Sequence, residues 1–293
     1  MDDIKKRIFN LETQLKNNAY EYYTLDNPSI SDVEYDYLYH ELLMYYENYP
    51  SLITNDSITR KVGYQLVNKF TKYQHAYQMY SLDNAFNFND LDAFDQTIRK
   101  ESFNYEYVVE PKIDGLAISL TYKDGLLESG VTRGNGLIGE NVTNNIKTIS
   151  DIPIVLNEKI DLVVRGEVYL KRSMFNKINE DLSNNNKDQF VNARNAAAGT
   201  LRQLDSKIVA KRQLSAFFYN IANYQELNLK THFECLTYLK KLGFCVNDQI
   251  KLHSKMSEVE KQINVIESKR ALNDYDIDGA VIKINDLALQ EKL

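Results

Sequence analysis

The spacing of apolar residues changes near residue 66, and this change constrains the fold more than any other feature of the sequence. Upstream, apolar side chains recur at the spacing of amphipathic helices. One stripe consists of Ile4, Ile8, Leu11 and Leu15, and a second consists of Tyr35, Leu38, Leu42 and Tyr45. Ser31 and Glu34 have capping-box spacing at the start of the second stripe, and Pro50 ends it. We therefore predict a small helical domain over residues 1–66.

From about residue 105 onward, strand and hairpin patterns prevail. An Asp-Gly pair within 122–127 predicts a tight hairpin, and 132–141 form a glycine-rich turn. Strands are predicted at 161–170 and 214–224, and helices at 171–183 and 231–243. The second helix has an apolar face of Phe233, Leu236 and Leu239, with Gly243 as its stop. Residues 67–84 read as a connector. Because helices and strands do not alternate regularly, the fold class is expected to be α+β with antiparallel sheets.

The composition narrows the class of protein. At 293 residues and 43% hydrophobic content, the chain is long enough for one or two domains with substantial cores. It has no apolar run long enough for a membrane span, and its start is an amphipathic helix rather than a signal peptide. Cys235 and Cys245 are too few for a disulfide framework or a zinc site. We expect a cytoplasmic protein.

Charge is distributed unevenly along this acidic chain, whose net charge is −6. Residues 1–60 hold eleven acids and five bases, whereas 194–213 hold five bases and one acid. The basic run is compatible with local phosphate contacts. It is equally compatible with a solvated helix face.

Glu110, Lys112 and Asp114 interrupt the stretch 108–125 near its start. Side chains alternate across a strand, so we expect all three on one face. A lysine amine becomes nucleophilic when desolvation or nearby cations favour its neutral form, and the adjacent apolar strand is expected to desolvate Lys112. The alternative is a cross-strand salt bridge with Lys112 as a solvated partner.

Further ionisable residues lie on or beside apolar strands. Arg133 sits on a turn bounded by glycines, where its guanidinium could meet phosphate or ribose oxygens. Glu167 lies at the centre of a predicted strand, which is costly unless it is paired. In residues 275–285, an acidic turn enters an apolar strand that carries Lys283. An ordinary core does not tolerate so many charges.

Together these segments resemble the N-terminal part of a bacterial NAD-dependent DNA ligase. "EPKIDGLA" (110–117), "TRGNGLIGENVT" (132–143), "VRGEVYL" (164–170) and "DIDGAVIKIN" (276–285) resemble motifs I, Ia, III and IV of covalent nucleotidyltransferases. "NARNAAAGTLRQLD" (192–205) resembles a run peculiar to the NAD-dependent ligases. "YEYYTLDNPSISDVEYDYLYHEL" (20–42) resembles their extra domain for the nicotinamide mononucleotide (NMN) half of NAD.

The resemblance implies a role for each matching residue. Lys112 would attack the adenylyl phosphate, forming lysyl-AMP and releasing NMN. The adenylyl half of NAD would be bound by Ser81, Leu82, Glu110, Arg133, Glu167, Tyr219, Val281 and Lys283. Glu110 would meet adenine and Tyr219 would stack on it, Arg133 and Glu167 would hold the ribose, and Lys283 would contact the phosphate. Asp114, Gly115 and Asp278 would support the site, and Arg194, Arg202 and Arg270 match positions implicated in DNA-dependent steps.

The NMN half would be gripped by Tyr22, Tyr23, Asp32, Tyr35 and Asp36. Two acids four residues apart suit a cationic nicotinamide ring, and tyrosine rings suit stacking. Acids in the first turns of a helix also simply complement its dipole, which is the alternative.

The implied architecture is a helical NMN-binding domain (1–66) followed by an ATP-grasp-like nucleotidyltransferase domain on antiparallel sheets (67–293), incomplete before motif V. The implied cofactors are NAD+ and Mg²⁺, or Mn²⁺ in its place, without an assigned protein ligand. Zinc is expected only in C-terminal regions absent from this sequence. The implied partners are NAD and nicked double-stranded DNA in replication and repair, for a monomer away from membranes. Two alternatives stay open: a weakened NAD-binding fragment, and an ATP-dependent nucleic-acid ligase or capping-type enzyme.

Overall fold

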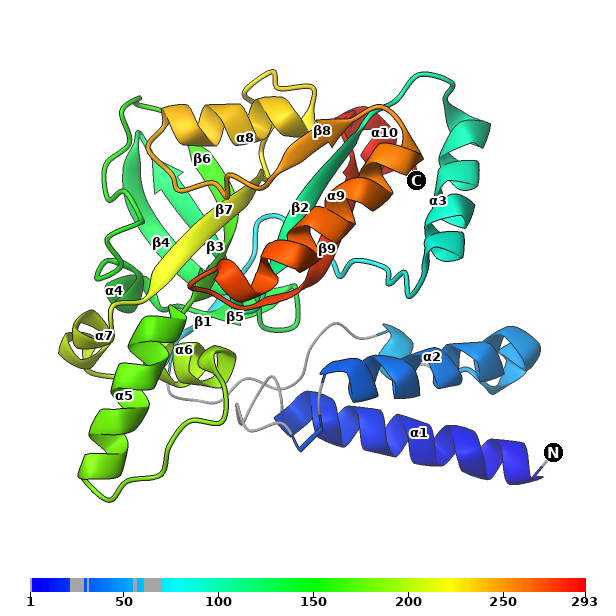
Figure 1. Cartoon of the computed structure of the whole chain (residues 1–293), viewed down its shortest axis with the longest axis horizontal. Coiled ribbons are helices and arrows are strands. Elements are labelled where there is room, and N and C mark those ends of the chain that lie inside the picture. Colours follow the sequence, from blue (N-terminus) through cyan, green and yellow to red (C-terminus); the bar gives the residue numbers. More distant parts are fainter. Residues whose placement is uncertain (1, 22–28, 31, 55–56, 61–69) are drawn as a thin grey trace. The chain divides into compact units, whose positions relative to one another are not determined.

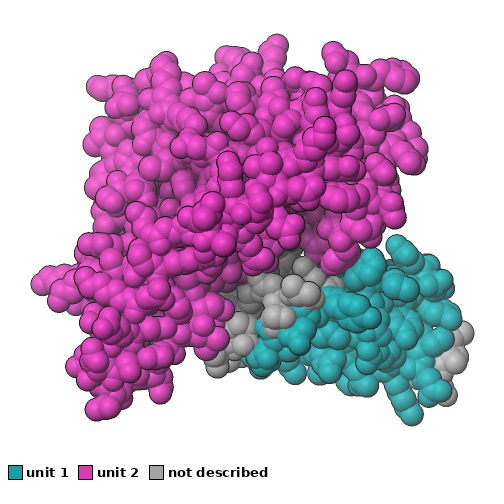
Figure 2. All heavy atoms as spheres, in the orientation of Figure 1, with its two compact units in different colours: residues 1–81, 133–141 teal, residues 82–132, 142–293 magenta. Residues whose placement is uncertain are grey.

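The computed structural model describes residues 2–21, 29–30, 32–54, 57–60 and 70–293. The chain forms two compact units, one of Met1–Ser81 with Arg133–Asn141 and the other of Leu82–Thr132 with Val142–Leu293 (Figure 2). The predicted boundary between residues 66 and 67 lies within 61–69, outside the described residues. No helix in the described part of the chain has both the length and the apolar character needed to cross a membrane.

Two helices form most of the first unit, α1 (Asp2–Tyr20) and α2 (Asp32–Asn48) (Figure 1). Both predicted apolar stripes are confirmed, because they meet in one core with Leu11, Leu15 and Leu42 fully buried. The 3-10 helix η2 (Pro50–Leu52) follows, and its first residue is the proline that was expected to end the helix. A second 3-10 helix, η3 (Ile58–Arg60), adds Ile58 to the core.

A short two-stranded sheet completes the first unit. Strand β1 (Lys72–Gln74) pairs antiparallel with β5 (Ile138–Glu140), and Tyr73 lies opposite Gly139. The predicted connector and the glycine-rich turn therefore each contain a strand. Three residues are too few to show the alternation that reveals a strand in sequence.

The second unit is built on two antiparallel sheets, as the α+β prediction requires (Figure 1). One has the order β4-β3-β6-β7, with β3 (Leu116–Lys123), β4 (Leu126–Thr132), β6 (Leu162–Tyr169) and β7 (Ser215–Ile221). The other has the order β8-β2-β9, with β2 (Tyr107–Ile113), β8 (Lys251–His253) and β9 (Ile277–Ile284). Asp124 and Gly125 have positive φ in the β3–β4 turn, which confirms the predicted hairpin.

Helices surround these sheets. They are α3 (Phe88–Glu101), α4 (Thr143–Ile146), α5 (Arg172–Asn184), α6 (Ala193–Leu201), α7 (Ser206–Arg212), α8 (His232–Lys241), α9 (Met256–Lys269), the 3-10 helix η4 (Arg270–Leu272) and α10 (Leu287–Lys292). Helices α5 and α8 confirm the two predictions. Leu236 and Leu239 of α8 are buried and Gly243 has the positive φ of a helix stop, but Phe233 is 39% exposed, so its assignment to the apolar face was wrong. Cys235 takes the buried position instead, because it lies three residues after His232 and four before Leu239, on the same helix face.

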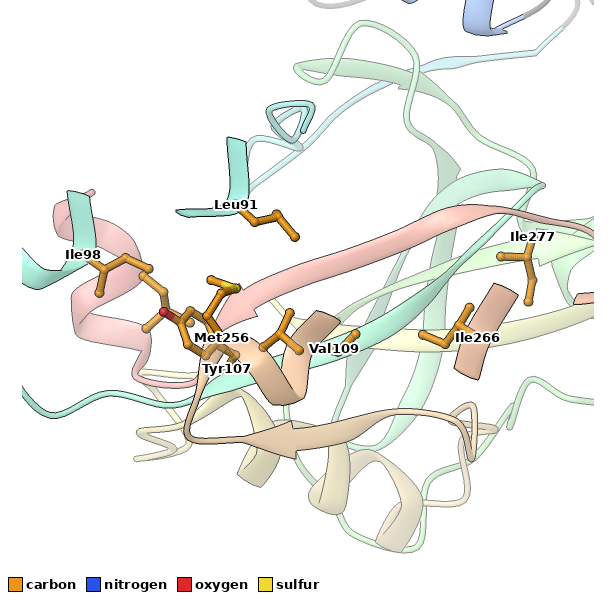
Figure 3. Close-up of a cluster of buried hydrophobic side chains, with 9 residues drawn as sticks. Leu91, Ile98, Tyr107, Val109, Met256, Ile266 and Ile277 are labelled. Atoms are coloured by element: carbon orange, nitrogen blue, oxygen red, sulfur yellow. The ribbon is translucent and has the colours of Figure 1, made fainter. Parts of the chain in front are cut away.

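The core beneath the β8-β2-β9 sheet holds the site's main strand in place. Side chains from α3, β2, α9 and β9 point toward one another there (Figure 3). Ile98, Val109 and Val259 are fully buried. Asp95 of α3 accepts hydrogen bonds from the hydroxyls of Tyr105 (2.6 Å) and Tyr107. The inner face of β2 is thereby fixed by apolar packing and by a buried carboxylate that is fully engaged.

Candidate active site

Strand β2 presents Glu110 and Lys112 on the face opposite this core. Tyr107 and Val109 face inward, and alternation turns the intervening residues the other way. Asp114 lies beyond the end of the strand, where its backbone N–H donates to the carbonyl of Asp276 (3.0 Å). The predicted shared face therefore holds for Glu110 and Lys112, but the alternation does not extend to Asp114.

Glu110 is the centre of a buried polar cluster. Its Oε1 atom lies 2.5 Å from Nε2 of His232 and accepts a hydrogen bond from Nζ of Lys283 (2.9 Å). Lys283 comes from β9, two register positions from Glu110, because Val108 lies opposite Lys283 and Glu110 opposite Val281. His232 is the first residue of α8 and is fully buried. The ammonium of Lys283 also lies 5.1 Å from the ring centroid of Tyr219 in β7, which joins the two sheets of this unit.

The cluster holds one negative and one positive charge. Burial alone would raise the pKa of Glu110, but the charges and hydrogen bonds of Lys283 and His232 outweigh it and lower that pKa. Burial also lowers the pKa of His232, helped by the charge of Lys283 and opposed by Glu110. At neutral pH the cluster is thus a carboxylate, an ammonium and a neutral imidazole.

Lys112 forms a salt bridge with Asp278 of the neighbouring strand β9. A register shift between Lys112 and Ile113 leaves Asp278 at the irregularity, between Gly279 and Ile277. The Lys112 side chain keeps 47% exposure, so the predicted desolvation by the apolar strand was wrong. The strand ends here and a carboxylate, rather than an apolar wall, faces the amine. The cross-strand salt bridge, given as the alternative, is present.

A second ion pair flanks the first. Nη1 of Arg194, near the start of α6, lies 3.1 Å from Oδ1 of Asp114. Burial lowers the pKa of Arg194 to about 10, against the opposing charge of Asp278, so the guanidinium stays protonated at neutral pH. The Arg194 side chain is only 23% exposed, so it does not lie on a solvated helix face. Lys207 and Lys211 of the same basic run are exposed.

Glu167 and Gly115 meet where β3 approaches β6. Glu167 lies inside the sheet, opposite Ala117 on one side and Phe217 on the other. A Cβ atom on Gly115 would lie 2.3 Å from the carbonyl oxygen of Val168 and 3.1 Å from Cγ of Glu167. Only glycine permits this close approach, which brings Glu167 beside the end of β2.

Two of the predicted adenylyl-side residues belong to the first unit. Nη2 of Arg133 donates a 2.7 Å hydrogen bond to Oγ of Ser81, while the buried Nε finds no acceptor among the described residues. Gly134 and Gly136 have positive φ, so the turn needs both glycines. Leu82, the next residue after Ser81, is 59% exposed.

Comparison with known proteins assigns this arrangement to a family. A family model described as NAD-dependent DNA ligase adenylation domain matches residues 67–293. Another, described as DNA ligase-like, N-terminal NAD+-binding domain, matches residues 1–63. The chain belongs to the NAD-dependent DNA ligase family. One solved structure, titled "Pmar-Lig_Pre.", aligns with 84% of this chain and 48% of its own at 12% identity and a TM-score of 0.40. The ligase chain thus spans about half of that structure's length.

The residues predicted to contact NMN are described only in part. Tyr22 and Tyr23 lie outside the described residues, as do the side chains of Asp32 and Asp36. Tyr35 packs against the core of the first unit and stacks on Tyr39, with ring centroids 6.4 Å apart.

Two further arginines of the ligase lie at helix ends. Arg202 caps the C-terminus of α6, and Arg270 opens η4 and is exposed. No described group of three or more His, Cys, Asp or Glu side chains could hold a metal ion.

His232 is the site residue that the sequence reasoning missed. A sequence signal exists, because Thr231 and Glu234 have the spacing of a capping box and place His232 at the first position of a helix. Nothing in that signal says that the imidazole reaches a carboxylate in a strand 122 residues earlier.

Proposed function

We propose that Lys112 is the nucleophile of the adenylation step and forms lysyl-AMP from NAD+. The observation that carries the proposal is the position of Lys112: within the matched adenylation domain, half-exposed near the end of β2, paired with Asp278 and two residues after Glu110. Phosphoryl transfer needs little more than a positioned nucleophile and charged groups that stabilise the phosphate, and both are present.

In the proposed step, the lone pair of neutral Nζ attacks the phosphorus of the adenylyl group. The bond from that phosphorus to the bridging oxygen breaks, and NMN leaves with the electron pair. The ammonium proton must depart first, and the salt bridge with Asp278 stabilises the ammonium. The pair must therefore open before attack, and Asp278 is the neighbouring acceptor for the proton.

The other residues predicted for the adenylyl side bind the adenylyl half of NAD+. Glu110 accepts from the base, Tyr219 stacks on it and Val281 lines the pocket with Ser81 and Leu82. Glu167 and Arg133 hold the ribose. The ammonium of Lys283 turns from Glu110 to contact the phosphate. Support comes from the shared surroundings of Glu110, Lys283 and Tyr219 and from the buried Nε of Arg133, which has no acceptor among the described residues.

Residues 1–66 are proposed as the NMN-binding domain, with Tyr22, Tyr23, Asp32, Tyr35 and Asp36 as its contacts. Residues 67–293 are proposed as a covalent nucleotidyltransferase domain with an ATP-grasp-like fold. The two family matches support this division, and the NAD+-binding match disfavours an ATP-dependent enzyme.

The proposal extends to the complete enzyme. Mg²⁺ neutralises phosphate charge when bound, and Asp114 and Asp278 supply the acidic surroundings. AMP then passes to the 5′-phosphate of nicked double-stranded DNA during replication and repair, with Arg194, Arg202 and Arg270 serving the DNA-dependent steps. The enzyme acts as a monomer in the bacterial cytoplasm.

Intact mass after incubation with Mg²⁺ and either NAD+ or ATP tests the central step. We expect a gain of one AMP from NAD+ alone, and no gain in Lys112→Arg, which keeps the positive charge but not a nucleophilic amine. Lys123→Arg is the matched control, because Lys123 is an exposed lysine in a salt bridge with Asp161 and is assigned no role. An adduct formed from ATP, or one retained in Lys112→Arg, would overturn the proposal.

A further inference from the structure

The two carboxylate oxygens of Glu110 have different surroundings. Oε1 lies within hydrogen-bond distance of both His232 and Lys283, whereas Oε2 accepts no hydrogen bond from any described residue. The side chain is only 5% exposed. A carboxylate oxygen on a nearly buried side chain, with no donor among the described residues, is suited to a hydrogen bond from a bound molecule.

The protonation of His232 follows from its neighbours. An ionised carboxylate only accepts hydrogen bonds, so Nε2 must carry the proton and donate it to Oε1. Lys283 only donates, so its 3.3 Å approach to the same nitrogen adds no second hydrogen bond. Nδ1 then holds a lone pair, and it is buried with no partner in the described part of the chain. Of the two donors to Oε1, only Lys283 carries a charge that a phosphate would attract. The neutral imidazole of His232 would stay with Glu110 when a phosphate binds.

Backbone contacts and a helix cap fix the start of α8, which carries the imidazole. The N–H of His232 donates to the carbonyl of Asn285 (2.7 Å), and the N–H of Phe233 donates to its Oδ1 (3.0 Å). Thr231 and Glu234 cap the helix at the same point. The start of α8 is therefore tied to Asn285, the residue after β9, and the ring itself is fully buried. Lys283, in contrast, has a flexible stem and is the residue assigned to the phosphate.

We propose that His232 is a specificity-determining residue that acts through Glu110. It holds Oε1, so that Oε2 is aimed to accept a hydrogen bond from an exocyclic amine of a purine base. Adenine carries such an amine, and hypoxanthine carries a carbonyl oxygen in its place, which a carboxylate repels. The inference rests on the proposed function, because it assumes that Glu110 meets the base.

The test compares the binding of AMP and IMP to the full chain by calorimetry, since neither ligand requires chemistry. The wild type is expected to prefer AMP by about tenfold or more, the usual discrimination from one hydrogen bond to a charged group. His232→Phe removes the donor and is expected to reduce this preference to about threefold or less, mainly by weakening AMP binding. His232→Gln restores an N–H donor and is expected to restore most of the preference. His232→Leu replaces His232→Phe if the larger ring prevents folding.

Cys235→Ala is the matched control, because Cys235 is buried one turn further along α8 and is assigned no role. It loosens the helix without touching Glu110, so the ratio of AMP to IMP affinity is expected to stay that of the wild type. An unchanged ratio in His232→Phe, with both ligands weakened equally, would show that His232 is merely structural and would overturn the inference alone. Failure of the wild type to bind AMP would overturn the proposed nucleotide site and the inference with it.

Discussion

His232 is buried as a neutral imidazole, and this makes stability depend on pH. Its folded pKa lies below the ordinary value of 6.5 because burial and Lys283 disfavour the charged ring. Below pH 6.5 the unfolded chain therefore binds a proton that the folded chain does not. Stability is present above that pH and is lost as the pH falls toward the lower, folded pKa.

We expect His232→Gln to remove this component, because glutamine keeps a donor to Glu110 and does not titrate. The free energy of unfolding of the wild type should fall relative to that of His232→Gln by about 1 kcal/mol between about pH 7.5 and about pH 5.5. Urea denaturation followed by circular dichroism at both pH values measures it. The other histidines contribute equally to both proteins. Parallel pH profiles would contradict a neutral buried His232.

Gly115 tests the close approach between β3 and β6. In Gly115→Ala the new methyl group would lie 2.3 Å from a backbone oxygen that cannot move independently. We expect a loss of about 3 kcal/mol in the free energy of unfolding. Gly199→Ala is the control, because its methyl group would meet only the ring of Phe190, at 3.3 Å, and it is expected to change stability by about 1 kcal/mol or less. Equal effects would mean that the Gly115 turn can relax.

At the scale of single residues, the sequence predicts which charged residues lie in apolar strands, but not which residues they contact. Glu110, Lys112 and Lys283 stand out because they interrupt apolar strands, and the structure places them on neighbouring strands. The partners His232 and Arg194 come from helices far along the chain, and strand periodicity contains no information about such contacts. The exposure of Lys112 depends on where β2 ends, and a register shift in the partner strand decides that.

Helix α8 illustrates the scale of the element, because its first turn supports the site. Thr231 accepts from the backbone of Glu234, and the Glu234 side chain accepts in return from the backbone of Thr231. We expect Thr231→Ala to lower the free energy of unfolding by about 1 kcal/mol, and Thr231→Ser, which keeps the hydroxyl, to cost only a small part of that. Thermal unfolding of the three proteins measures the difference. Equal losses for alanine and serine would show that the hydroxyl does not cap the helix.

Elements with a long, regular pattern were predictable, and short ones were not. The two stripes of α1 and α2 and the Asp-Gly hairpin follow from local rules. Strands β1 and β5 are three residues each and exist because they pair with one another. Phe233 precedes Leu236 by three residues yet is exposed, because the buried face of α8 consists of His232, Cys235, Leu236 and Leu239.

At the scale of the whole molecule, the proposed function divides NAD recognition between the two matched parts of the chain. The proposed contacts of NMN lie in residues 22–36, and those of AMP lie mainly in the second unit. This division makes AMP a selective probe, since it carries only one half of the cofactor. Variants on the NMN side should then affect NAD+ and leave AMP unaffected.

The double variant Asp32→Asn, Asp36→Asn tests this division in the full chain. Both substitutions remove a negative charge that suits the cationic nicotinamide ring, so the KM for NAD+ in lysyl-AMP formation should rise about tenfold or more. The Kd for AMP should stay within about twofold of the wild type, because AMP lacks the nicotinamide half that these acids are proposed to contact. Glu34→Gln removes an exposed acid of the same helix and is expected to change neither constant. If the double variant weakens AMP as much as NAD+, the acids act on folding rather than on NMN. If it changes neither constant, they only complement the helix dipole.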